Sequence, residues 1–162
     1  MKKWTPVKEI ENYEYLCDKI QNEDYQKRVK YSFIYYIRNA NFYKYLGMTL
    51  SILGIVMPAF ATVLTVCGAH TGWITFATAS ATAASGLFAY LKCADKQATY
   101  RKAAENMKAE LVAYAAGQGV YKTEEGKETD KDTLLFERIE PIIQNGYEKI
   151  AALERKGMES GN

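Results

Sequence analysis

Residues 46–66 read LGMTLSILGIVMPAFATVLTV and contain no charged side chain. As an α-helix this stretch is about 31 Å long, which matches the ~30 Å hydrocarbon core of a bilayer. A second uncharged stretch, WITFATASATAASGLFAYL, follows at residues 73–91. The short connection at residues 67–72 contains two glycines, which suit a tight turn. The sequence therefore predicts a hairpin of two transmembrane helices, with the lipid bilayer as the surroundings of both.

The alternative is a hairpin buried in the core of a soluble domain, but two adjacent uncharged segments of spanning length are rare in a chain of 162 residues. Trp73 and Tyr90 lie near the ends of the second segment, where aromatic anchors meet the lipid headgroups. The turn lacks Lys and Arg, whereas both flanks are basic: Arg38, Lys44, Lys92, Lys96, Arg101 and Lys102. We therefore expect a multi-pass protein of the cell inner membrane with both termini in the cytoplasm.

The charged ends of the chain show helical periodicity, and we expect an all-α integral membrane protein of one domain, residues 1–162. Its two-helix transmembrane hairpin carries long helices that extend into a cytoplasmic helical bundle. Apolar spacing predicts a cytoplasmic helix over residues 7–45 and a continuation of the second transmembrane helix to about residue 116. A C-terminal helix is predicted over residues 132–156, with Asp132 as its N-cap.

Composition gives little support for catalysis. The net charge of +2 provides no strong field for nucleic acid, so no nucleic-acid partner is expected. The three cysteines have no CxxC spacing, and the single histidine, His70, lies in the predicted turn. Nucleophile, phosphate-loop and metal motifs are absent from the sequence. We expect no enzyme activity, no catalytic residues, no metal site and no cofactor.

Each predicted span carries a stripe of small or hydroxyl side chains at helical spacing. Two readings compete for such stripes: close packing of helices, with Ser and Thr bonded to their own backbone, or the wall of a water path in an oligomer. We assign the first span to helix packing, through Gly47, Ser51, Gly54, Pro58 and Ala61. We assign the second span to a pore lining, through Thr75, Thr78, Thr82 and Ser85.

Residues 100–110 read YRKAAENMKAE and are followed by Gly119-Val120-Tyr121. With the order of predicted helices, this stretch resembles the SLATT family, the two-transmembrane domains associated with SMODS nucleotidyltransferases and SLOG sensors in prokaryotic conflict systems. The resemblance implies a membrane effector of bacterial antiviral defence that forms pores under the control of a separate nucleotide-sensing or regulatory protein.

Within that stretch, Arg101 and Glu105 are four residues apart, so their side chains can pair on one face of a helix. We expect a structural brace from this ion pair. Two functions are then predicted for the whole chain. The first is a homo-oligomeric ion channel or pore-forming effector. The alternative is a non-conducting membrane scaffold that docks a cytoplasmic partner.

Overall fold

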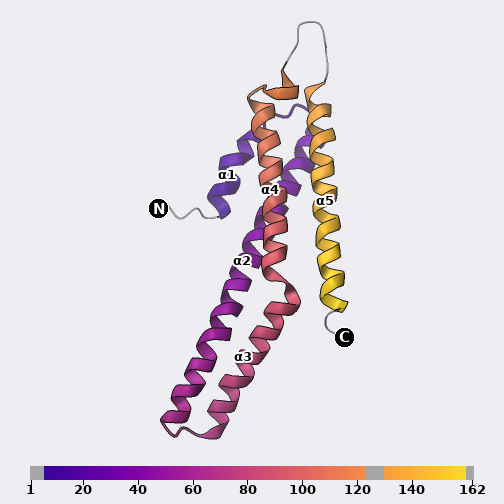
Figure 1. The fold of residues 1–162 in the computed structure, drawn as a ribbon. Coiled ribbons are helices and arrows are strands. Elements are labelled where there is room, and N and C mark those ends of the chain that lie inside the picture. The colour runs from indigo at the N-terminus through magenta and orange to yellow at the C-terminus, as the bar shows by residue number, and fades with distance from the viewer. Residues whose placement is uncertain (1–5, 123–129, 160–162) are drawn as a thin grey trace. The chain divides into compact units, whose positions relative to one another are not determined.

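The computed structural model describes residues 6–122 and 130–159, and every element in that part of the chain is a helix (Figure 1). The all-α prediction is therefore confirmed. In chain order, the elements are α1 (Pro6–Cys17), α2 (Glu23–Val66), α3 (Thr71–Leu91), α4 (Cys93–Ala115), the short 3-10 helix η1 (Gly119–Tyr121) and α5 (Lys131–Glu159).

Contacts divide the chain into two compact units. The bundle unit combines the chain up to Asn41 with Ala98–Ile150, and the hairpin unit combines Phe42–Gln97 with the chain from Ala151 onward. Helices α2, α4 and α5 each contribute residues to both units.

The bundle unit has an apolar core drawn from four helices. The buried side chains recur every three or four residues, as expected for helix faces that meet in a core. Burial of each large apolar side chain stabilises the fold by roughly 1.5–3 kcal/mol. The fully buried members on α2, α4 and α5 are Val29, Phe33, Ile37, Met107, Leu111, Leu135, Ile139 and Ile143, and α1 adds Leu16 and Cys17.

Tyr36 of α2 is fully buried in this core and fixes the packing of α5. Its hydroxyl donates a hydrogen bond of 2.8 Å to the carbonyl oxygen of Ile143. The ring occupies the space where a side chain at Gly146 would lie, since a Cβ there would collide with Tyr36 Oη and come 2.9 Å from Cζ. Only glycine fits at position 146 without displacing Tyr36.

The single helix predicted over residues 7–45 is two helices in the structure. Helix α1 ends at Cys17, and α2 begins at Glu23. The break is set by Asn22, whose Oδ1 accepts hydrogen bonds from the backbone N–H groups of Asp24 and Tyr25 at 3.0 and 3.2 Å. This N-cap satisfies donors that the first turn of α2 leaves free.

The continuous helix predicted from residue 73 to about 116 is also interrupted. Helix α3 ends at Leu91, and Lys92 adopts the left-handed conformation with φ of 46° before α4 begins. This conformation costs a non-glycine residue roughly 1–2 kcal/mol. Helix α4 ends at Ala115, just before Gly117, whose φ of 60° suits a helix terminus.

The C-terminal helix is longer than predicted, Lys131–Glu159 rather than 132–156, and its N-cap differs. Asp130 caps it, because Oδ1 accepts from the backbone N–H of Asp132 and Oδ2 from the hydroxyl of Thr133. The prediction of Asp132 as the cap is therefore wrong. Asp132 instead accepts hydrogen bonds from distant parts of the bundle unit.

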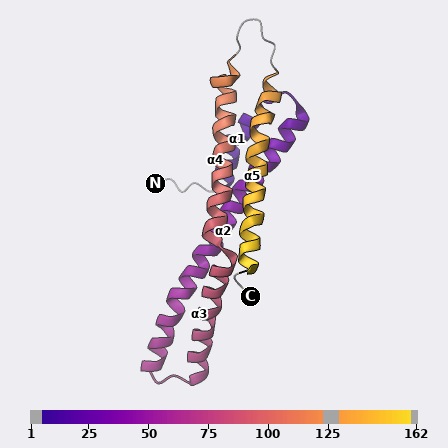
Figure 2. The same ribbon diagram turned by 45° about the vertical axis from the view of Figure 1, so that its right-hand side comes forward.

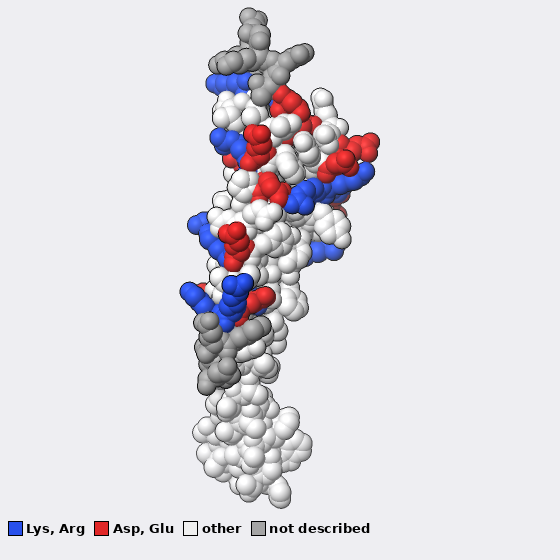
Figure 3. Space-filling model, turned by 90° about the vertical axis from the view of Figure 1, so that its right-hand side faces the viewer, with Lys and Arg blue, Asp and Glu red and all other residues white. Residues whose placement is uncertain are grey.

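In the hairpin unit, α3 and the second half of α2 run side by side, joined by a tight turn (Figures 1 and 2). Gly68 has φ of 66° in this turn, and His70 Nδ1 accepts the backbone N–H of Gly72 at 3.1 Å to cap α3. Figure 3 shows no charged side chain over the hairpin on the face that it draws.

Two helical segments, one in each arm of this hairpin, are long and apolar enough to cross a membrane. Only 11% and 17% of the residues in their apolar windows are buried in the structure. Core helices of soluble proteins bury most of such a window, so these segments are apolar without being a protein core.

Replacement of Gly146 by Ala is predicted to destabilise the bundle unit by about 1–3 kcal/mol, because the added methyl group collides with Tyr36. Gly86→Ala is the control, since its Cβ would meet no atom within 4 Å. Helix propensity favours both substitutions by up to about 1 kcal/mol. Thermal unfolding in detergent, followed by circular dichroism, should show a lower midpoint for Gly146→Ala only. Equal shifts for the two variants would refute the role of Tyr36.

Candidate functional site

Helix α3 uses alanines to pack against α2. The buried residues of α3 are Ala77, Ala81 and Ala84. The four hydroxyl residues predicted to line a pore are all exposed in the hairpin unit: Thr75, Thr78, Thr82 and Ser85. The hairpin's own packing therefore leaves Thr75, Thr78 and Thr82 uncovered, whereas Ser85 Oγ lies next to Gly54 of α2.

Two of these hydroxyls bond to their own helix. Thr78 Oγ1 donates to the carbonyl oxygen of Ile74 at 2.9 Å, and Thr82 Oγ1 donates to the carbonyl oxygen of Thr78 at 3.1 Å. Each hydroxyl oxygen keeps acceptor capacity directed away from these bonds. The stripe is thus tolerable against an apolar surface and also able to accept hydrogen bonds from water.

The small residues predicted for packing on α2 divide between two surroundings. Gly47 is buried, and a Cβ there would lie 3.1 Å from Cys93 Cβ. A Cβ at Gly54 would lie 3.2 Å from Ser85 Oγ, and Ala61 is buried. These contacts place the two glycines and Ala61 on the inner face of the hairpin, with Ser51 half-buried beside them, whereas Pro58 is exposed.

Large apolar side chains cover the outer surface of α2 instead. Exposed fractions there reach 73% for Ile55 and 57% for Val63. On α3 the large exposed side chains are confined to the ends, because residues 77–86 read ATASATAASG. The two arms of the hairpin therefore present different surfaces: large apolar side chains on α2, and small or hydroxyl side chains along the middle of α3.

A buried cation lies at the charged end of the hairpin unit. The Lys96 side chain is only 10% exposed, and its Nζ lies 3.2 Å from Glu154 Oε1 of α5 and 5.2 Å from the centre of the Tyr43 ring. Burial favours the neutral amine, but the bonds to Glu154 and Tyr43 outweigh it and raise the pKa of Lys96. Lys96 therefore ties the end of α5 to the hairpin unit.

The bundle unit holds a charged network around Glu9 of α1. Both Glu9 carboxylate oxygens pair with the Arg101 guanidinium, at 2.8 Å each, in a bidentate arrangement. Lys108 Nζ lies 3.3 Å from Glu9 Oε1 and 4.2 Å from the centre of the Tyr13 ring. Glu105 bridges the two cations, 2.6 Å from Arg101 and 3.2 Å from Lys108.

The sequence placed Arg101 and Glu105 together but gave no sign of Glu9, which lies 92 residues from Arg101. Burial alone would raise the pKa of Glu9, yet the hydrogen bonds and charges of Arg101 and Lys108 together hold it below its usual value. The network therefore joins α1 to α4 through a carboxylate that stays ionised at neutral pH.

Two tyrosine–carboxylate pairs connect α4 and η1 with α5 in the same unit. Tyr114 donates a short hydrogen bond of 2.5 Å to Asp132 Oδ1, and the backbone N–H of Asn22 donates to Oδ2 at 2.7 Å. Tyr121 donates to Glu110 at 2.8 Å, and Arg138 pairs with the same carboxylate at 3.2 Å. Burial and these bonds raise the pKa values of both tyrosines, so both remain donors.

Within the described residues there is no group of three or more His, Cys, Asp and Glu side chains placed to hold a metal ion. His70 serves as the cap of α3. Cys17 and Cys93 are buried, and Cys67 is exposed in the turn. Burial raises the pKa of the Cys17 thiol to about 11, so it is a poor nucleophile at neutral pH.

A family model described as "Protein of unknown function (DUF4231)" matches residues 27–129, which include both arms of the hairpin. The match covers more than half of the chain, and the chain therefore belongs to this family. No curated protein and no solved structure matches the chain.

Glu9→Gln is predicted to destabilise the protein by about 1–2 kcal/mol at neutral pH, because it removes the charge that joins Arg101 to Lys108. The lowered pKa of Glu9 contributes stability above its unfolded-state value of about 4.3, and this contribution is lost as pH falls through the folded-state pKa. The variant should therefore lose less stability than the wild type on acidification.

Thermal midpoints in detergent between about pH 7 and pH 3 measure this difference. Glu23→Gln is the matched control, because the side chains of Glu23 and its partner Lys27 are 80% and 71% exposed. Such a surface pair is worth less than about 1 kcal/mol. Parallel pH curves for Glu9→Gln and the wild type would contradict the role assigned to Glu9.

Proposed function

We propose that this member of the DUF4231 family is an integral membrane protein that assembles into a homo-oligomeric pore. Its hairpin spans the bilayer as two helices, residues 46–66 and 73–91. Support for insertion comes from the length of these segments and from the large apolar side chains that α2 exposes. The turn at residues 67–72 lacks Lys and Arg, which favours both termini in the cytoplasm.

The observation that carries the pore is the uncovered hydroxyl stripe of α3. Thr75, Thr78 and Thr82 lie outside the alanine face that packs on α2, and their oxygens have acceptor capacity to spare. Two spans are too few to enclose a channel, so several copies are required. In the proposed assembly, α2 faces lipid with its large apolar side chains and α3 of each copy lines the water path.

The biological setting proposed here follows from the resemblance to the SLATT family. Residues 100–110, which carry that resemblance, lie within the stretch that the DUF4231 model matches. We propose a pore-forming effector of the bacterial inner membrane in antiviral defence, controlled by a separate nucleotide-sensing or regulatory protein. The alternative, a non-conducting scaffold that docks a cytoplasmic partner, is separated from this proposal by conductance.

Flux of a small dye from liposomes that contain the purified protein should fall several-fold for Thr78→Leu and for Thr82→Leu, because the larger side chains narrow the path. Thr78→Val keeps the shape of the side chain and removes only the hydroxyl, so it isolates the effect of polarity. Phe76→Leu is the control on the same helix, since Phe76 is 62% exposed outside the stripe.

Cross-linking must show the same assembly for every variant, so that a change in flux reports the lumen. Unchanged flux in both leucine variants would show that the hydroxyl stripe does not line the lumen. Absence of flux from the wild type, with assembly intact and with overexpression harmless to cells, would favour the scaffold.

Topology is tested with the exposed cysteine of the turn. An impermeant thiol reagent is expected to label Cys67 in intact cells whose outer membrane is permeabilised. Cys17 and Cys93 are buried, so an exposed reporter is needed for the cytoplasm. Gln118→Cys in a Cys67→Ser background supplies one, because Gln118 is exposed. Labelling of that reporter before the inner membrane is opened would contradict the proposed cytoplasmic location of the termini.

A further inference from the structure

A cavity of about 320 Å³ lies between α4 and α5 within the bundle unit. Its lining comes from one face of each helix, since the residues recur every three or four positions. The lining residues on α4 are Ala98, Thr99, Lys102, Ala103 and Asn106, and those on α5 are Pro141, Ile142, Asn145, Gly146 and Lys149.

Two positions on α4 leave space beside α5 because their side chains are single methyl groups. Ala98 and Ala103 contribute single methyl groups from α4, and Gly146 contributes no side chain from α5. A Cβ at Gly146 would collide with Tyr36, so the core excludes a larger residue at this position. The small residues along this face therefore leave the space between the two helices open.

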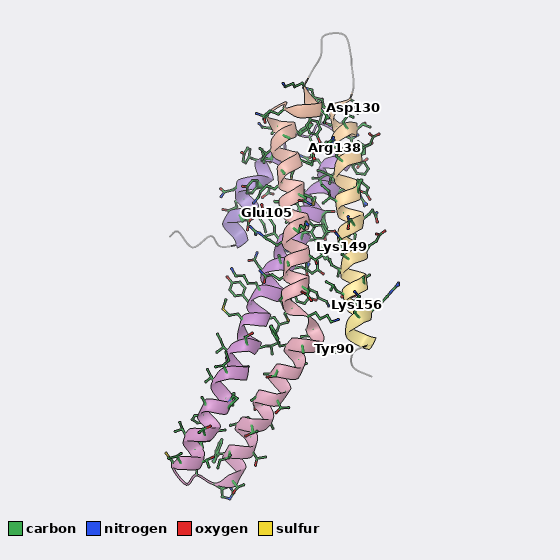
Figure 4. The ribbon with its side chains drawn as sticks, in the orientation of Figure 1. Tyr90, Glu105, Asp130, Arg138, Lys149 and Lys156 are labelled. Carbon is green, nitrogen blue, oxygen red and sulfur yellow. The ribbon has the colours of Figure 1, made fainter. Side chains whose placement is uncertain are left out.

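Two contacts between side chains set the register of the two helices. Tyr114 bonds to Asp132, and Glu110 pairs with Arg138. The two helices are therefore antiparallel, because lower residue numbers on α4 lie beside higher residue numbers on α5. Continued along the helices, this antiparallel register places Lys102 level with Asn145 and places Lys149 level with Ala98. The two lysines are thus one helical turn apart in height, about 6 Å, and Figure 4 labels Lys149 on α5.

The charges of the cavity are unbalanced. Its lining contains two lysines and no Asp or Glu. Among the described residues, neither Lys102 nor Lys149 has an acidic partner, whereas other cations of the unit pair between helices: Arg28 with Glu140, Lys30 with Glu14, Arg101 with Glu9 and Arg138 with Glu110. The nearest acid along α4, Glu105, is already engaged by Arg101 and Lys108.

We propose that this cavity binds a small organic phosphate. The two lysine amines hold the phosphate group at one end, where they supply charge-assisted hydrogen bonds. Asn106, Pro141 and Ile142 line the other end, and they accommodate a compact body through apolar contact and amide hydrogen bonds. The volume lies at the lower end of the range for small-molecule sites, which suits one such molecule.

Phenyl phosphate is a suitable probe because it joins a phosphate to a compact apolar body. Its ³¹P resonance is titrated with the full-length protein in dodecyl maltoside, a detergent without phosphate. Broadening that saturates is expected for the wild type. Lys102→Gln and Lys149→Gln should each weaken binding about tenfold, as expected for loss of one charge-assisted bond.

Two controls separate a built site from general attraction of anions. Lys122→Gln removes an exposed lysine outside the cavity and should leave binding unchanged. Ala98→Phe fills the cavity without removing charge and should abolish binding, because Ala98 lies on its exposed lining. Circular dichroism confirms that each variant is folded. A variant that combines Lys102→Gln with Lys149→Gln should not bind. Binding equal to that of the wild type, in this variant or in Ala98→Phe, refutes the site, as does the absence of saturable binding to the wild type.

Lipid headgroups carry the same phosphate chemistry as a soluble ligand. The titration is therefore repeated in nanodiscs of phosphatidylcholine alone and with phosphatidylglycerol added. Unchanged affinity supports a free organic phosphate as the ligand. If phosphatidylglycerol competes with phenyl phosphate, and Lys149→Gln relieves this competition, the occupant of the same cavity is a lipid phosphate. Because neither result depends on conductance, failure of this proposal is distinct from failure of the proposed pore.

Discussion

The close approach of α2 and α3 across small side chains is the constraint on which the hairpin depends. Ala77, Ala81 and Ala84 supply the contact face of α3, and Gly47 and Gly54 leave too little space on α2 for more than a methyl group. In the bilayer proposed for this hairpin, helices would gain nothing from the hydrophobic effect by associating, so close packing would supply the attraction. Gly47, Gly54 and Ala61 therefore lie on the contact face of α2, whereas most of its large apolar residues are exposed.

The bundle unit is held together by polar contacts of a different kind. Glu9, Tyr36 and Asp132 each place a polar group in a largely buried position and satisfy it with partners from distant parts of the chain. A buried polar group without its partner costs more than the bond is worth, so each of these contacts excludes alternative packings. Apolar burial drives this unit together, and these contacts specify which helix faces meet.

The sequence predicted well whatever depends on local composition. The uncharged run around Pro58 identified an apolar helix because length and lack of charge are properties of that segment alone. The breaks at Asn22 and Lys92 were missed, since apolar spacing continues across both and only capping geometry marks the ends. Asp130 and Asp132 are both residues that commonly cap helices. Asp132 does not cap α5 because its carboxylate accepts hydrogen bonds from Tyr114 and Asn22. Glu9 lay beyond prediction because its partners are brought near only by the fold.

The absence of large side chains from the middle of α3 supports assembly more strongly than its hydroxyl groups do. Thr78 and Thr82 bond to their own helix, so their hydroxyls alone do not require water or a partner. Residues 77–86 contain no side chain larger than threonine, however, and a surface of this kind forfeits dispersion contacts when it faces disordered lipid chains. A second helix recovers those contacts by close approach, and water uses the free acceptors. In the proposed assembly, further copies would place a second helix beside α3, and a lumen would bring water to its free acceptors.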